Sequence, residues 1–189
     1  MSGGGGVRGL TGAVTHVTTN GRAVMAAQWY LRSATIGTRV RLRGRPVVHN
    51  WGEMIIGDRT QLVSTVATLE LVAYEGGRLE VGERTLLNYG TSITAASTVT
   101  IGARCLIGTH VTIMDNDFHR LEPDRRLERP DSRPISIGEN VWLGTRVIVL
   151  GGVTIGAGSA IGAGSIVTKD IPPMSLAVGT PARVIRSLE

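Results

Sequence analysis

Aliphatic residues recur at every sixth position through most of the second half of the chain. Blocks that start with such a residue follow one another from residue 137, as IGENVW, LGTRVI, VLGGVT, IGAGSA, IGAGSI and VTKDIP, and from residue 101, as IGARCL, IGTHVT and IMDNDF. An α-helix needs apolar positions every three or four residues and an amphipathic strand needs them every two, so a period of six fits neither. It predicts short strands joined by turns, with three hexads forming one triangular coil and the first residue of each hexad pointing inward.

The coils of this repeat are expected to stack about 4.8 Å apart through parallel-sheet hydrogen bonds. Less regular hexads, VGERTL, LNYGTS and ITAAST, precede residue 101, and Ile56 with Leu62 marks a first, degraded coil. Each coil alone buries little, so the stack as a whole supplies the stability. We therefore predict an all-β domain, a parallel β-helix over residues 51–189 with a C-terminal tail over residues 171–189.

A different pattern precedes the repeat. The stretch RAVMAAQWYLRS has the spacing of an amphipathic helix, with four apolar residues able to share a face, Val24, Ala27, Tyr30 and Leu31. We expect this helix, in a cap region over residues 21–50, to pack on the open end of the β-helix and cover exposed strand edges. The opening MSGGGGVRGL lacks the apolar run of a signal peptide, and residues 1–20 are expected to form a flexible leader.

The repeat is interrupted by HRLEPDRRLERPDSRPIS, residues 119–136. This segment has the length of one coil, but it contains three prolines and nine Arg, Asp and Glu residues, several of them where a coil needs aliphatic side chains. We therefore predict an extruded loop. Loops beside a rigid scaffold commonly carry binding and catalytic groups, and a histidine, His119, opens this one.

Composition and charge narrow the classes of function. The chain has 26 Gly but only one Phe, three Tyr and three Trp, so the core must be aliphatic and many turns must be tight. The net charge of +5 comes from Arg residues spread along the chain, without the clustered basic and aromatic residues typical of nucleic-acid binding. Nucleic acid is therefore not an expected partner.

Two further features bear on the compartment. The uncharged stretch from Val147 to Val167 carries six glycines and the six-residue period, which indicates repeat core and not a membrane span. The single cysteine, Cys105, excludes an intramolecular disulfide, fits a reducing compartment and occupies a slot for a small core residue. We expect a soluble, cytoplasmic protein with no membrane partner.

The chain resembles the hexapeptide-repeat acyltransferases in the order of its motifs, MDNDFHRLEPDRR, the loop, ISIGENVWLG, VTIGAGSAIGAGSIVTKDIPP and GTPARVIR. The resemblance covers roughly residues 56–186 and is to the CoA-dependent O-acetyltransferases of the maltose, galactoside and nodulation-factor type. Through DNDFH it is similar to enzymes that acylate sugars of polysaccharides or glycosylated natural products. It implies a left-handed β-helix and direct transfer from acetyl-CoA without a metal. It also implies a homotrimer with active sites between subunits, in which outward residues such as Trp142 and Val147 would pack against the neighbouring subunit.

The same resemblance makes His119 the general base, because the histidine at the start of the loop has that role in these families. An imidazole, whose ordinary pKa is ~6.5, can remove the proton of a sugar hydroxyl as the hydroxyl attacks a thioester. Asp115 and Asp117 are candidates to fix the tautomer of that imidazole. Asp117 either orients His119 or caps the turn into the loop, and Asp115 is also a candidate contact of the acceptor.

Contacts of the two substrates are implied in the same way. The residues that match the family's acetyl-CoA contacts are Trp142, Gly144, Thr145, Ala163, Thr168, Lys169 and Arg183. Backbone N–H groups of Gly144 and Thr145 are candidates to hold the oxyanion. Asn88 matches an acceptor-side asparagine, although Gly90 stands where a second asparagine is often found.

The expected function is transfer of an acetyl group from acetyl-CoA to a hydroxyl of a sugar or glycosylated small molecule. N-acetylation of an amino sugar and acetylation of an antibiotic are alternatives on the same fold. A γ-class carbonic anhydrase would need three histidines around a metal, and only His110 and His119 lie in the regular coils. A non-catalytic assembly module would need neither the histidine nor the loop.

Overall fold

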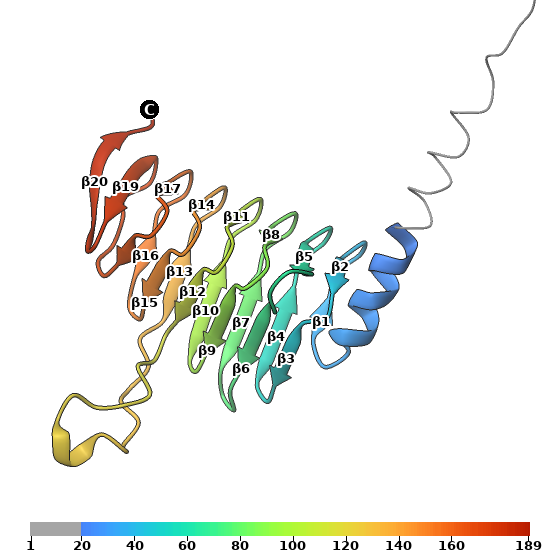
Figure 1. Cartoon of the computed structure of the whole chain (residues 1–189), viewed down its shortest axis with the longest axis horizontal. Coiled ribbons are helices and arrows are strands. Elements are labelled where there is room, and N and C mark those ends of the chain that lie inside the picture. Colours follow the sequence, from blue (N-terminus) through green and yellow to red (C-terminus); the bar gives the residue numbers. More distant parts are fainter. Residues whose placement is uncertain (1–19) are drawn as a thin grey trace, which may run out of the picture.

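The computed structural model describes residues 20–189, which form one helix followed by a stack of parallel strands (Figure 1). The helix runs over residues 20–30 and lies at one end of the stack. Of the expected leader, residues 1–19 lie outside the described residues, and Asn20 belongs to the helix. Within residues 20–189, no helix has the length and apolar character required to cross a membrane.

The strands form three sheets, and each turn of the chain adds a strand to every sheet. Sheet A contains β1 (Thr35–Ile36), β4 (Glu53–Ile56), β7 (Arg78–Val81), β10 (Thr98–Ile101), β13 (Ile135–Ile137) and β16 (Thr154–Ile155). Sheet B contains β2 (Arg41–Gly44), β5 (Gln61–Ser64), β8 (Leu86–Leu87), β11 (Leu106–Ile107), β14 (Trp142–Leu143), β17 (Ala160–Ile161), β19 (Ser175–Gly179) and β20 (Ala182–Ser187). Sheet C contains β3 (Val47–Asn50), β6 (Glu70–Ala73), β9 (Ser92–Ala95), β12 (Thr112–Met114), β15 (Ile148–Leu150) and β18 (Ile166–Val167). Pairing is parallel except between β19 and β20, which close the chain as an antiparallel hairpin.

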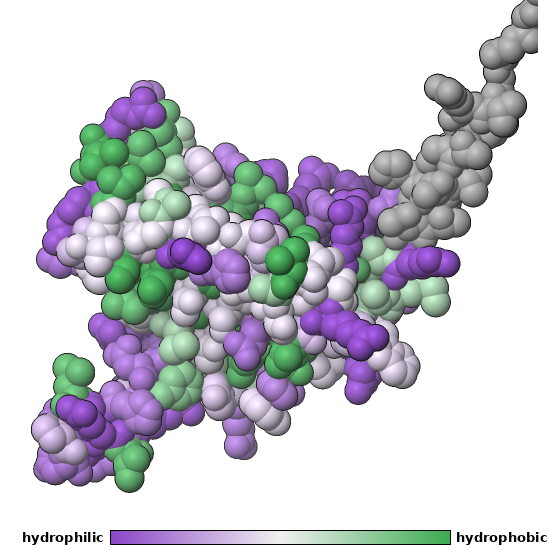
Figure 2. Space-filling model, in the orientation of Figure 1, coloured by the Kyte–Doolittle hydropathy of each residue, from purple (hydrophilic) through white to green (hydrophobic). Residues whose placement is uncertain are grey.

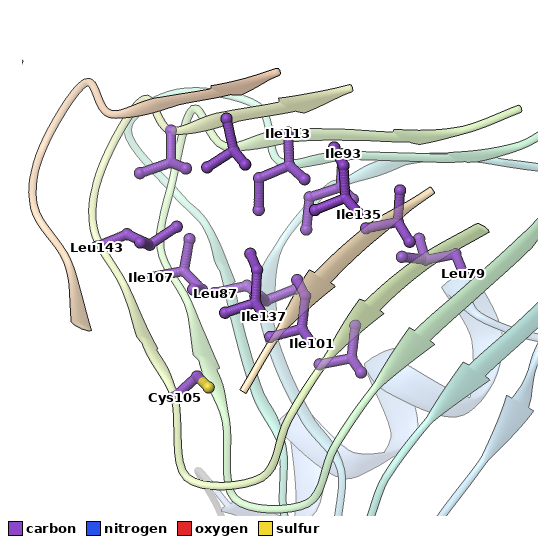
Figure 3. Close-up of a cluster of buried hydrophobic side chains, with 14 of the residues drawn as sticks. Leu79, Leu87, Ile93, Ile101, Cys105, Ile107, Ile113, Ile135, Ile137 and Leu143 are labelled. Atoms are coloured by element: carbon purple, nitrogen blue, oxygen red, sulfur yellow. The ribbon is translucent and has the colours of Figure 1, made fainter. Parts of the chain in front are cut away.

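The aliphatic residue that opens each hexad points into the interior, as predicted. In sheet B the paired inward column consists of Leu42, Leu62, Leu87, Ile107, Leu143, Ile161 and Ala177, all of them buried. Figure 3 shows such residues of all three sheets converging on the centre of the coil, with Cys105 among them. The Cys105 thiol donates to the carbonyl of Gly138 at 3.1 Å, and its burial raises the pKa of the thiol. The interpretation of Cys105 as a small core residue is confirmed.

The β-helix begins earlier than residue 51. Ile36 pairs with Ile56, and Leu42 pairs with Leu62, so residues 35–50 form the first coil instead of belonging to a cap. The helix itself caps the stack as expected, with Ala27 and Leu31 fully buried against the first coil.

The end of the interruption also differs from the prediction. Ile135 is buried and pairs with Val99, so strand β13 begins two residues before Ile137 and the loop ends at Pro134. Because Ile135 points inward as well as Ile137, strand β13 carries two inward residues where the first place of one hexad supplies only one.

Tight turns join sheet A to sheet B. Their left-handed residue has φ between 50° and 58° in six coils, at Arg39, Arg59, Arg84, Arg104, Asn140 and Met174. The glycine in the second place of the hexad lets successive coils touch at this corner, because a Cβ on Gly82 would lie 2.4 Å from the nitrogen of Ala103. This close approach explains why glycine is part of the repeat.

The three outer faces differ in polarity. On sheet A the outward residues are polar apart from Ile55, and they include Arg78 and Glu80, which form an ion pair at 2.7 Å. On sheet B they include Leu106 and Trp142, which pair in register and are 51% and 57% exposed. On sheet C they include Met114, Ile148, Leu150 and Ile166. Val147, expected to face outward with Trp142, is fully buried in the core because it holds the fifth place of its hexad, like the buried Cys105 and Val141.

Candidate active site

The interruption of the repeat is an extruded loop, residues 115–134, which leaves the stack between β12 of sheet C and β13 of sheet A (Figure 1). It contains one short 3-10 helix, η1 (Pro123–Arg125), whose residues are all exposed. Figure 2 shows the loop as a mostly hydrophilic projection. Two hydrophobic side chains near its tip, Leu121 and Leu127, are 91% and 96% exposed.

Asp115 anchors the start of the loop to the preceding coil. Its carboxylate is 1% exposed and accepts hydrogen bonds from the backbone nitrogens of Ala96, Ser97 and Thr98 at 2.7–2.8 Å. Both carboxylate oxygens are therefore used inside the protein. The expectation that Asp115 contacts the acceptor or His119 is not met, since the side chain holds the turn between β9 and β10 instead.

Asn116 closes the base of the loop, a role that the sequence did not indicate. Its side-chain nitrogen donates to the carbonyl of Pro130 and to the hydroxyl of Ser132, both at 2.8 Å, and its oxygen accepts from the nitrogen of Phe118 at 2.6 Å. The residue is 3% exposed. Phe118 has a left-handed backbone, φ 60°, which turns the chain so that His119 follows on the exposed side.

A backbone carbonyl orients His119. The imidazole Nδ1 lies 2.7 Å from the carbonyl oxygen of Arg126, which can only accept, so Nδ1 carries the proton. In the neutral ring Nε2 then keeps its lone pair, and the side chain that carries it is exposed. Asp117, the expected partner, instead lies 3.8 Å from Arg133 across the base of the loop and makes no hydrogen bond to His119.

An ion-pair network stiffens the segment that supplies this carbonyl. Arg125 donates to both carboxylate oxygens of Glu128, the shorter distance being 2.7 Å, and Arg120 lies 3.3 Å from the same carboxylate. The Arg125 hydrogen bond, with the Arg120 charge, lowers the pKa of Glu128. These contacts fold residues 120–128 back toward His119.

The residues expected to bind acetyl-CoA divide between two corners of the stack. Gly144, Thr145 and Ala163 lie in the turns that follow sheet B, as does Asn88 two coils before Gly144. Arg183 is the second residue of β20, next to a turn whose Gly179 nitrogen donates to the Ser165 hydroxyl oxygen at 3.0 Å, and so joins the same corner. We call this the B–C corner.

Thr168 and Lys169 lie elsewhere. They follow β18 and are exposed at the corner between sheets C and A, the C–A corner from which the His119 loop also leaves. Trp142 stands on the outer face of sheet B. One chain therefore does not gather the expected donor contacts around His119.

The B–C corner combines small residues with exposed arginines. Its residues are small, and a Cβ on Gly164 would meet no atom within 4 Å, so the ridge is open. The side chains of Arg146 and Arg183 are exposed beside it and are suited to bind phosphate oxygens. The Gly144 nitrogen donates to Ile161 at 2.8 Å, which leaves the nitrogen of Thr145 as the candidate for the oxyanion.

Within residues 20–189, no three His, Cys, Asp or Glu side chains come together in a group that could hold a metal ion. His110 packs edge-on against Tyr89, with 5.8 Å between ring centroids. It lies at the B–C corner and thus away from the His119 loop.

Comparison with known proteins gives a consistent set of relatives. Residues 134–169 match the family described as bacterial transferase hexapeptide (six repeats). The chain is 38% identical over 160 residues to galactoside O-acetyltransferase of Escherichia coli (strain K12), which covers 78% of this chain and 79% of the relative. It superposes on galactoside acetyltransferase in complex with coenzyme A with a TM-score of 0.60 and 30% identity, over 92% of this chain and 82% of the other. A hexapeptide-repeat acetyltransferase of Vibrio cholerae O1 biovar eltor, complexed with acetyl coenzyme A, has a TM-score of 0.60 and 27% identity over 91% and 86% of the two chains.

Proposed function

Because this chain belongs to the hexapeptide-repeat acetyltransferases, proteins with a left-handed β-helix that use acetyl-CoA, we propose that it acetylates a hydroxyl of a sugar or glycosylated small molecule. His119 is the general base of that reaction. The observation that carries the proposal is the 2.7 Å contact between Nδ1 and the Arg126 carbonyl, which leaves Nε2 as the proton acceptor of an exposed side chain. A sugar hydroxyl is the favoured acceptor because the E. coli relative is a galactoside O-acetyltransferase.

The reaction needs no covalent enzyme intermediate. The acceptor oxygen bonds to the carbonyl carbon of the acetyl thioester while its proton passes to Nε2 of His119. The carbon–sulfur bond then breaks, and the thiolate of coenzyme A takes the proton from the imidazolium, which restores the base. The nitrogen of Thr145 is placed to stabilise the oxyanion, provided that the B–C corner lies beside His119.

A trimer meets that condition. His119 lies at the C–A corner and Thr145 at the B–C corner, so a groove lined by both requires the corners of two copies. The outer faces of sheets B and C carry apolar residues such as Trp142 and Ile148, whereas the outer face of sheet A is mostly polar. In a threefold arrangement the apolar faces would pack together, and Leu121 and Leu127 of the loop would rest on the neighbouring copy.

The test of the catalytic role is the variant His119→Ala. We expect the rate of acetyl transfer to fall by at least about 10²-fold, since a general base contributes about 10²–10⁴-fold, while the affinity for acetyl-CoA stays unchanged. The assay follows release of the coenzyme A thiol with a panel of sugars, amino sugars and aminoglycosides. His110→Ala is the matched control. A near-normal kcat for His119→Ala would refute the assignment, and turnover of amino acceptors alone would change the reaction to N-acetylation.

The trimer is tested by the mass in solution. Light scattering should give three times the mass of the 20.0 kDa chain. Trp142→Arg places a charge on the apolar face and should weaken assembly and activity together. A fully active monomer would contradict the shared groove.

A further inference from the structure

A row of aromatic side chains runs along the C–A corner toward His119. The rings of His49 and Trp51 stack at 5.1 Å with an interplanar angle of 3°, Trp51 and Tyr74 lie 5.7 Å apart, and Tyr74 and Phe118 lie 5.4 Å apart. Phe118 directly precedes His119. The chain has one Phe, three Tyr and three Trp, and this row contains the Phe, one Tyr and one Trp, so scarce residues concentrate beside the proposed catalytic base.

Glycines let the turns that carry Trp51 and Tyr74 pack tightly. A Cβ on Gly52 would lie 2.2 Å from the carbonyl oxygen of Gly77 and 2.3 Å from that of Tyr74. The nitrogen of Gly77 also donates to the Tyr74 carbonyl at 2.8 Å, which closes the second turn. Because backbone meets backbone here, the two rings are held in a defined relation before any ligand binds.

The row is exposed and hollowed. Trp51 is 59% exposed, and together with Tyr74 and Glu75 it lines a depression of about 450 Å³. Trp51 also lines an adjoining pocket of about 280 Å³, which includes Asn50. The side-chain oxygen of Asn50 is buried and finds no donor among the described residues.

The loop is attached to the same row. The guanidinium of Arg129 lies 4.8 Å from the Tyr74 ring centroid and 5.0 Å from that of Phe118, which is the geometry of a cation–π contact. The aromatic row and the loop that orients His119 therefore form one surface.

We infer that Trp51 and Tyr74 form a stacking subsite for a second sugar ring, so that the acceptor is an oligosaccharide or a longer glycoside and not a free monosaccharide. This inference rests on the proposed function and names its substrate class. A pyranose presents C–H groups on its faces and hydroxyls on its rim, so it pairs with an aromatic face and with polar groups at the edge. His49 stacks on one side of the Trp51 ring, and the exposed side of Trp51, with Tyr74 next to it, supplies the apolar surface. Glu75 and Arg129 supply polar groups at its edge.

The experiment compares acceptors of increasing length. The series glucose, maltose and maltotriose and the series galactose, β-1,4-galactobiose and β-1,4-galactotriose are tested for kcat/KM with the wild-type trimer and the variants Trp51→Ala and Tyr74→Phe. Trp29→Ala is the control, because Trp29 is 67% exposed on the N-terminal helix and outside the row. We expect at least one series to favour the longer acceptors by about tenfold, the order of magnitude of one stacked ring.

The variants should separate the subsite from catalysis. Trp51→Ala should remove the preference for longer acceptors and leave kcat/KM for the monosaccharide and KM for acetyl-CoA unchanged, while Tyr74→Phe and Trp29→Ala keep the preference. Equal use of all lengths by the wild type, or a preference that survives Trp51→Ala, would overturn the subsite. A raised KM for acetyl-CoA would assign the row to the donor instead.

Binding is measured independently of turnover. Saturation-transfer NMR with the same sugars on the His119→Ala protein should show the second ring in closest contact, and Trp51→Ala should abolish that contact. If no sugar is acetylated but the longer ones bind in this way, the proposed function fails while the subsite stands. If no sugar binds, the subsite is wrong.

Discussion

Removal of the Asn116 side chain should misplace the catalytic base without unfolding the β-helix. In Asn116→Ala three hydrogen bonds are lost, those to Pro130, Ser132 and the nitrogen of Phe118. A buried donor or acceptor left without a partner costs about 1–3 kcal/mol, and water can reach part of this site because the loop around it is exposed. We therefore expect the ordered loop to lose about 1.4–2.8 kcal/mol of free energy relative to the disordered loop. With the two forms close in free energy in the wild type, this loss lowers kcat about ten- to hundredfold, since only the ordered loop holds His119 in place.

The assay combines activity with stability. Thiol release should show the fall in kcat with an unchanged KM for acetyl-CoA, because Thr145 and Ala163 lie at the other corner of the chain. Thermal melting followed by circular dichroism should stay within a few degrees of the wild type, since the core columns do not include Asn116.

Two matched variants divide the role of this side chain. Ser132→Ala removes only one of the three hydrogen bonds and should have a small effect. Asn116→Asp keeps an acceptor for the Phe118 nitrogen but turns an oxygen toward the Pro130 carbonyl, so its kcat should be intermediate. An unchanged kcat in Asn116→Ala would show that His119 is positioned without the loop base, and global unfolding would show that Asn116 supports the stack itself.

Three further predictions concern single side chains. Asp115→Ala leaves three backbone N–H groups without their acceptor, so the melting temperature measured by differential scanning calorimetry should fall clearly. An unchanged melting temperature would show that Asp115 does not stabilise the fold. The thiol of Cys105, whose pKa is raised by burial, should not react with a disulfide reagent at pH 8 until the protein is denatured; rapid reaction of the native protein would contradict its burial. Because its pKa is lowered in the folded loop, Glu128 should stay ionised at pH values below the ordinary glutamate range. Its pairing with Arg125 stabilises the folded loop fully above the unfolded pKa, and this stabilisation should be lost as the pH falls through the lowered pKa. An NMR titration of the Glu128 carboxyl measures this pKa. Salt at 1 M should raise it back toward the ordinary glutamate value, and an ordinary value at low salt would refute the pairing.

The sequence predicted most of the fold because the repeat is a local property. A residue such as Leu143 or Ile161 recurs at a fixed interval, and the interval alone specifies that it points inward and pairs with its counterpart one coil away. The first coil keeps the interval of six at Ile36, Leu42 and Val48, but it was missed because eight residues then separate Val48 from Ile56, which breaks the continuity with the next coil. The break in the interval likewise located the loop and His119.

The contacts of the site depended on the tertiary structure. Asp115 and Asp117 are equally polar in the sequence, but only Asp115 meets the backbone of Ala96 to Thr98 in the preceding coil, and its carboxylate is buried there. The partner of His119 is a backbone carbonyl, which carries no side-chain signal and is brought near only by the fold of the loop.

The distribution of the expected donor contacts over two corners was decided by the winding of the chain. Thr145 and Lys169 both match acetyl-CoA contacts of the family, but the chain turns a corner of the β-helix after each strand. Thr145 therefore lies at the B–C corner and Lys169 at the C–A corner. Periodicity determines which residues face inward, because burial of apolar side chains repeats with the coil. Hydrogen-bond partners and shared surfaces are set by which coils and loops meet in space, and that depends on the lengths of the corners and on backbone contacts that the hexad pattern does not encode.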